Sequence, residues 1–204
     1  MSGEKRERGV LGHLATAFRL AVVFAVIAGL IYPLVLTGIG QLLFPFQANG
    51  SLIVENGQVV GSALIGQSFT SPRYFQGRPS ATGYLADASS ASNLGPTNPS
   101  LIAQVSQALG QVLAANPGVA VTQVPVDLVE SSDSGVDPDI SIQAALIQVP
   151  RVARANHLGR AQVLALVVSQ ERGRFLGLFG SPHVNVLELN LKLEALVRGG
   201  GGQS

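Results

Sequence analysis

The stretch LAVVFAVIAGLIYPLVLTGIGQLLFPF, residues 20–46, decides the architecture of this 204-residue chain. It contains no charged residue, and the uncharged run continues to Val54. A helix of that length would reach about 40 Å, which exceeds the roughly 30 Å hydrocarbon core of a bilayer. The sequence therefore predicts one transmembrane helix over residues 20–46.

Two other interpretations of this stretch are a cleaved secretory signal peptide and a buried core helix. A signal peptide is disfavoured because its apolar region rarely exceeds about 15 residues, and no small-x-small cleavage site closes this one. Pro33 lies in the middle and predicts a kink, which a neighbouring helix could accommodate. Small residues offer surfaces where such a helix could approach closely: Ala25, Ala28, Gly29, Gly38 and Gly40.

Charged residues flank the apolar stretch unevenly. Four basic residues precede it (Lys5, Arg6, Arg8 and Arg19, against Glu4 and Glu7), whereas the first basic residue after it is Arg73. The positive-inside rule then keeps residues 1–19 as a cytoplasmic tail and places residues 47–198 across the membrane. We expect 47–198 to form a single exported α+β domain, and the Gly-rich residues 199–204 to form a flexible tail.

Composition excludes several classes of protein. Hydrophobic residues make up 47% of the chain and charged residues only 12%, which argues against a disordered chain. The net charge of +1 argues against nucleic-acid binding. The absence of cysteine excludes disulfides and thiolate metal sites.

The exported part predicts a mixture of strands and helices. Strands are expected over 51–55 and 58–65, joined by a tight turn at Asn56-Gly57, because this dipeptide favours two-residue hairpins. A long polar loop over 67–98 follows. Helices are expected from Pro99 to the residue before Asn116, from Ser141 with an interruption at Pro150, over 160–169, and over 185–197, where an alternating leucine pattern leaves a strand possible. Further strands are expected over 120–126 and 174–179.

The sequence contains no complete version of the common catalytic motifs. The segment GSALIGQS at 61–68 resembles a phosphate loop, but Gln67 stands where the lysine belongs. His13, His157 and His183 are far apart in sequence, and there is no GxSxG elbow. No catalytic residue, bound cofactor or metal is therefore expected.

One acidic segment stands out at 127–139. Five carboxylates lie there with no base among them: Asp127, Glu130, Asp133, Asp137 and Asp139. A calcium loop starting at Asp133 or Asp137 lacks the glutamate at its twelfth position. Two interpretations stay open, namely a turn-rich loop that caps the following helix, and an acidic surface that attracts cations near a partner's pore.

Five ordered strings identify a family. They are YFQGRPSATGY (74–84), SNLGPTNPSL (92–101), SSDSGVDPDIS (131–141), QVPRVARAN (148–156) and VNVLELNLKL (184–193). Together with the N-terminal span, they resemble the C subunit of the Kdp potassium-transporting P-type ATPase.

The resemblance implies a non-catalytic accessory subunit of a bacterial inner-membrane complex. Its partners would be a potassium-channel-like subunit, an ATP-hydrolysing pump subunit and a small stabilising peptide. It also implies a catalytic chaperone that raises the ATP affinity of the pump subunit, with ATP binding to this chain implied by the family only. The alternatives from other classes are a membrane-anchored periplasmic enzyme and a solute-binding module.

The chain departs from the family pattern SGSGLDPHIS in the acidic segment. Asp133 replaces a glycine, which predicts an unfavourable backbone angle, and Asp139 replaces a histidine, which adds negative charge. Pro150 stands where the family carries an ordinary helix residue.

Individual residues of these strings are candidates for partner contact or loop scaffolding. The aromatic residues of the long loop, Tyr74, Phe75 and Tyr84, could anchor an interface or fill the core. Arg78 could stay solvated or pair with a partner's carboxylate. Asn93 is expected in a turn, and Asn185 and Asn190 are expected as buried scaffolding. Ser132, Asp133, Ser134, Asp137 and Asp139 are the candidates in the acidic segment.

Overall fold

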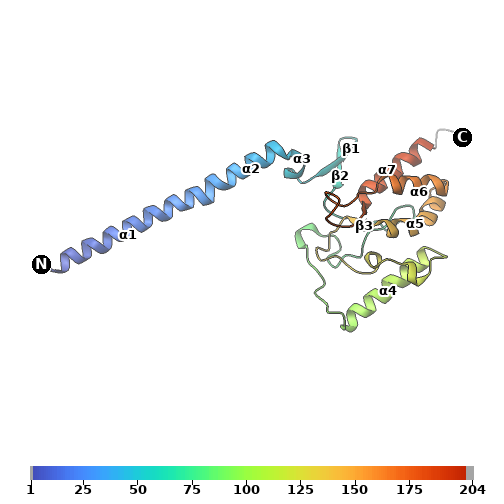
Figure 1. Cartoon of the computed structure of the whole chain (residues 1–204), viewed down its shortest axis with the longest axis horizontal. Helices are drawn as coiled ribbons and strands as arrows, with labels where there is room; N and C mark the ends of the chain where they lie inside the picture. The colour runs from blue at the N-terminus through green and yellow to red at the C-terminus, as the bar shows by residue number, and fades with distance from the viewer. Residues whose placement is uncertain (1, 201–204) are drawn as a thin grey trace. The chain divides into compact units, whose positions relative to one another are not determined.

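The computed structural model describes the backbone of residues 2–200 and the side chains of residues 9–199. The chain divides after Ser51 into two compact units. The first is a long apolar helix, and the second is a mixed unit of helices and small sheets (Figure 1). The expected fold class of one N-terminal apolar helix followed by an α+β unit is confirmed.

The first unit is helical through three consecutive elements: α1 (Ser2–Val26), a π-helical turn (Ile27–Ile31) and α2 (Tyr32–Leu43). Its segment Gly9–Leu43 is long and apolar enough to cross a membrane. The π-helical turn ends two residues before Pro33. Because proline lacks an N–H and crowds the carbonyl four residues earlier, a wider turn is one way for the helix to continue past it.

The helix ends before a second proline. Phe44, the residue before Pro45, has φ −135° and ψ 54°, because the proline ring disfavours a helical conformation at the preceding position. A short α3 (Pro45–Ala48) closes the first unit.

The second unit begins with an antiparallel hairpin of β1 (Leu52–Glu55) and β2 (Gln58–Ser62). The expected Asn56-Gly57 turn is confirmed, since the two residues have φ of 50° and 78°, the left-handed values of a type I′ turn. Both strands are slightly shorter than expected. A second pair, β3 (Asp139–Ser141) and β4 (His183–Asn185), was not predicted.

The four helices of this unit start where the sequence predicts. Asn98 accepts a hydrogen bond from Ser100 N–H at the start of α4 (Pro99–Ala115), and Ser141 caps α5 (Ile142–Ala155) through Ala144 N–H. The others are α6 (Arg160–Ser169) and α7 (Val186–Gly200), so the ambiguous C-terminal segment is a helix. Gly199 and Gly200 belong to α7, and residues 201–204 of the expected flexible tail lie outside the described residues.

Three predictions were wrong. Residues 120–126 form no strand but 3₁₀ turns (Val121–Gln123 and Val126–Leu128), because Pro125 cannot donate to a ladder. Residues 174–179 form a tight turn, because Leu176 and Gly177 have φ of 52° and 74°. Pro150 does not interrupt α5, whose neighbouring residues Val149 and Val152 are buried in the core and hold the helix together.

The hydrophobic core lies among α5, α6 and α7, which cluster together in Figure 1. Val149, Val152, Val163, Val167, Leu189 and Leu193 supply its helical faces. Phe75, from the long loop, is fully buried among them. α4 lies at one side of the unit, and none of its residues is buried (Figure 1).

Candidate functional site

The segment Pro72–Gln76 of the long loop is held by side chains rather than by a strand. Each of its five carbonyls accepts a hydrogen bond from a side chain of α5, α7 or the residue after α5. The donors are Arg151 to Pro72 and Tyr74, Asn156 to Arg73, Asn190 to Phe75, and Gln148 to Gln76. The carbonyls of this irregular segment, in which Phe75 is buried, are thereby satisfied without a neighbouring strand.

Two of these side chains each bind both the backbone N–H and the carbonyl of one loop residue. Asn190 accepts from Phe75 N–H at 2.8 Å and donates to its carbonyl at 2.9 Å. Gln148 does the same with Gln76, at 2.8 and 3.1 Å. Asn190, expected as buried scaffolding, is buried and binds the backbone of the long loop.

Arg151 is the charged centre of this arrangement. Its guanidinium is buried and donates to Asn116, to Gln148, and to the carbonyls of Pro72 and Tyr74. Burial lowers the pKa of Arg151 to about 10, so it stays charged at neutral pH. One planar cation thus ties two loop carbonyls to α5 and to Asn116 after α4 through charge-assisted hydrogen bonds.

The three aromatic candidates lie in different environments. Phe75 fills the core, whereas Tyr74 is half-buried and donates to Glu194 at 2.5 Å. That hydrogen bond raises the pKa of Tyr74 and lowers the pKa of Glu194. Tyr84 is half-buried and donates to the Arg78 carbonyl, and burial raises its pKa to about 12.

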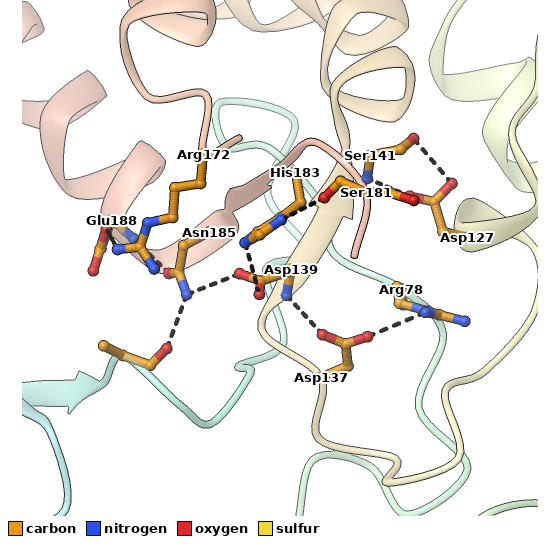
Figure 2. Close-up of polar contacts among 11 residues, drawn as sticks. Arg78, Asp127, Asp137, Asp139, Ser141, Arg172, Ser181, His183, Asn185 and Glu188 are labelled. Atoms are coloured by element: carbon orange, nitrogen blue, oxygen red, sulfur yellow. Dashed lines mark hydrogen bonds and ion pairs between the residues drawn. The ribbon is translucent and has the colours of Figure 1, made fainter. Parts of the chain in front are cut away.

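Three carboxylates of the acidic segment, Asp127, Asp137 and Asp139, contact groups of their own chain (Figure 2). Asp137 pairs with Arg78 at 3.1 Å and accepts from Asp139 N–H. Asp127 accepts from the backbone N–H and the hydroxyl of Ser141, the residue that caps α5. Arg78 therefore pairs with a carboxylate of its own chain, and about a quarter of its side chain stays exposed.

Asp139 is the first residue of β3 and lies beside β4 (Figure 2). It accepts from Asn185, whose amide also donates to the Ala63 carbonyl, and His183 Nε2 lies 3.7 Å away. Burial raises the pKa of Asp139, and the neighbouring His183 opposes that rise. Asn185, also expected as buried scaffolding, is buried and accepts from Glu188 N–H at the start of α7.

The remaining members of the acidic segment fix its path. Ser132 is buried and accepts from Gly135 N–H, and Ser134 accepts from Val136 N–H. Asp133 is exposed and does not have a positive φ, so the predicted strain at this position is wrong. The left-handed residue is Gly135, with φ 69°, where a Cβ would lie 2.8 Å from the Ser90 carbonyl oxygen. Glu130 and Asp133 are the exposed carboxylates of the segment.

Asn93 lies apart from these contacts. It is exposed, has φ of 54°, and donates to the Ala91 carbonyl. Asparagine tolerates this conformation, and the nearby hydrogen-bonded turn runs from Gly95 to Asn98.

Serine, histidine and aspartate do meet in this region, but not in a nucleophilic arrangement. His183 Nδ1 contacts the carbonyl of Ser181, and its Nε2 faces Asp139. The hydroxyl of Ser141 bonds to Asp127 instead. Among residues 9–199, no group of three or more histidine and carboxylate side chains could hold a metal ion.

A hollow of about 710 Å³ lies between the long loop and α4. Its lining includes Arg78 and Tyr84 from the loop, Gln111 and Val112 from α4, and Gln148 from α5.

Sequence reasoning missed the main holders of the loop, Asn116, Gln148, Arg151 and Asn156. The sequence did hint at a role for Gln148, Arg151 and Asn156. They are polar residues on or just after an otherwise apolar helix, and they lie in the string QVPRVARAN. Nothing in the sequence indicated which backbone groups they would bind.

The architecture is that of a small protein with one membrane-length helix and one folded unit braced by internal polar contacts. Residues 14–195 match the family described as KdpC, the c chain of K⁺-transporting ATPase. Potassium-transporting ATPase KdpC subunits from Acidobacterium capsulatum and Rhodopseudomonas palustris are 53% and 51% identical, over 91% and 93% of this chain and 100% of each relative. The subunit from Bacillus cereus is 45% identical over 91% of this chain and 96% of the relative. The chain belongs to the KdpC family.

Membership of this family supports an accessory role in potassium transport and is consistent with a non-catalytic subunit.

Proposed function

We propose that this chain is a single-pass subunit that assembles and stabilises an ATP-driven potassium uptake complex. The supporting observation is the family match, which covers the membrane-length helix and the folded unit together. The polar side chains described above hold the chain's own loop, which suits a rigid docking body better than an enzyme. Catalytic residues would lie on another chain.

The charge distribution supports an orientation with the N-terminus in the cytoplasm of a bacterial inner membrane. Residues 1–19 carry four bases before the apolar span, and the next base is Arg73. The span 20–46 would cross the bilayer, and residues 47–198 would lie in the periplasm.

The proposed partners are the channel-like subunit, the ATP-hydrolysing subunit and a small stabilising peptide. A Cβ added at Gly29, Gly38 or Gly40 would meet nothing within 4 Å, so these positions leave room for a partner helix. Raising the ATP affinity of the pump subunit is part of the proposal. With the folded unit in the periplasm, this effect would pass through the membrane as a conformational coupling, with no nucleotide bound to this chain.

Assembly is tested by tagging the ATP-hydrolysing subunit and purifying it from gently solubilised membranes. We expect this chain in stoichiometric amount, and a lower ATP concentration for half-maximal hydrolysis than in a complex made without it. Recovery of the chain only as a free monomer would overturn the assembly role. An unchanged ATP dependence would remove the coupling alone.

Orientation is tested by cysteine labelling, because the chain has no native cysteine. Ala88→Cys lies on an exposed turn, and Ser2→Cys lies at the N-terminal end. A membrane-impermeant maleimide applied to spheroplasts should label the first variant and spare the second until the cells are lysed. The reverse pattern would overturn the orientation.

A further inference from the structure

The turn between Arg172 and His183 presents four large apolar side chains to solvent. Phe175, Leu176, Leu178 and Phe179 are 72%, 74%, 76% and 64% exposed. Isolated surface apolar residues are ordinary, but four within five positions form a contiguous apolar tip.

The tip is an ordered structure. Arg172 and His183 exchange backbone hydrogen bonds at its base, at 2.8 and 3.0 Å. Phe175 and Phe179 exchange a second pair closer to the tip, at 2.9 and 3.0 Å. Leu176 lies between them with φ of 52°, a conformation that costs a non-glycine residue energy. The backbone thus holds an apolar side chain outward at some cost.

Cationic residues accompany the apolar tip. Arg174 directly precedes Phe175 and makes no ion pair within the described side chains, while Arg172 pairs with Glu188. The segment 172–182 contains these two arginines and no acid. An apolar tip with adjacent cations matches a bilayer surface, where apolar groups enter the acyl boundary and cations meet anionic head groups.

The same chain carries the membrane-length helix, and only residues 44–51 separate that helix from β1. This tether keeps the folded unit near a bilayer. The hairpin that follows the helix also exposes apolar residues, since Val54 and Val59 face each other across its strands and are 57% and 59% exposed. By contrast, four side chains are a small footprint for a stable protein interface, which usually buries about 800 Å² per partner.

We propose that the turn 174–179 inserts into the outer surface of the lipid bilayer, with Phe175, Leu176, Leu178 and Phe179 in the acyl boundary and Arg174 at anionic head groups. It gives the folded unit a second attachment to the membrane. The proposal rests on the membrane anchoring proposed above. The second attachment restricts the tilt of the folded unit relative to the bilayer.

The chain contains no tryptophan, so Leu178→Trp introduces a single fluorophore at the tip without altering the strained position 176. The full-length variant is reconstituted into vesicles of phosphatidylcholine and phosphatidylglycerol that contain brominated acyl chains. We expect a blue-shifted emission and quenching at least about twofold stronger than at Val121→Trp, an exposed control position in the same unit. Arg174→Glu added to the first variant should weaken the quenching.

The outcomes separate this proposal from membrane anchoring. Resistance to carbonate extraction reports the transmembrane helix, so an extractable chain would refute the anchoring. An integrated chain with an unquenched, red-emitting tryptophan would refute the lipid contact alone. Equal quenching at positions 178 and 121 would also refute the lipid contact. So would a blue shift that requires the other subunits and does not respond to brominated lipid, because the turn would then contact a protein.

Discussion

The side-chain amide of Asn190 pairs with both backbone groups of Phe75, a residue 115 positions away in the sequence. This contact fixes the only long-loop residue whose side chain is fully buried in the core of the described chain. It couples the long loop to α7, whereas the other side chains that hold the loop come from α5 and the residue after it.

Replacing that amide should cost much of the unit's stability. Asn190→Leu leaves the N–H and carbonyl of Phe75 buried without partners, for a loss of about 2–4 kcal/mol in the free energy of unfolding. Urea denaturation followed by circular dichroism on the full chain in detergent measures this loss. Gln107→Ala, on the exposed side of α4, is the matched control and should change stability by less than about 0.5 kcal/mol. Equal effects of the two variants would contradict the bracing role.

We expect that the positive charge of Arg151 alone does not maintain the stability of the folded unit and that its planar guanidinium group is also needed. Arg151→Lys keeps the charge but cannot reach Asn116, Gln148 and the two carbonyls from one fixed plane, so we expect a loss of about 2–4 kcal/mol. Arg154→Lys lies exposed on the same helix and provides the control. Thermal unfolding of both variants checks the difference, and a well-tolerated Arg151→Lys would show that the guanidinium geometry is unimportant.

The half-buried carboxyl of Asp139 should make stability pH-dependent. Because burial raises its pKa above the ordinary 3.8, the folded chain binds more protons than the unfolded chain between that value and the raised one. Asp139 therefore lowers the free energy of unfolding as the pH rises through that window. Asp139→Asn removes the titration, so the variant should gain stability relative to the native chain over the same rise.

Denaturation midpoints of both proteins, measured from about pH 3 to pH 7, test this sign. Asp133→Asn, which removes an exposed carboxylate of the same segment, should follow the native curve. A native chain that gains stability relative to Asp139→Asn as the pH rises would show that the sign is wrong.

Cation attraction by the acidic segment remains a proposal, carried by the two exposed carboxylates. Neutralising Glu130 and Asp133 together should weaken the apparent potassium affinity of the complex at low ionic strength, and salt should abolish the difference. Asp137→Asn should instead act on stability, since it removes the partner of Arg78, by up to about 1 kcal/mol. Unchanged potassium uptake in the double variant would eliminate the idea.

The sequence by itself determined the features that depend on residues adjacent in the sequence. The uncharged residues from Leu20 specify a membrane-length helix through length and apolarity, and this helix ends at Leu43. Asn98 and Ser141 start helices through their own side chains, and Asn56-Gly57 forms a turn through its backbone preferences. Each signal lies in one continuous stretch of sequence.

Only the tertiary structure decided which distant groups meet. The partners of the Pro72–Gln76 carbonyls lie 72–115 positions away, and α5 continues through Pro150 because the packing of its neighbours outweighs the lost hydrogen bond. Likewise, Arg78 found its carboxylate 59 residues along its own chain. Local preference cannot encode such pairings, because an irregular loop has no period and its buried backbone groups accept whichever donor the packed helices bring to them.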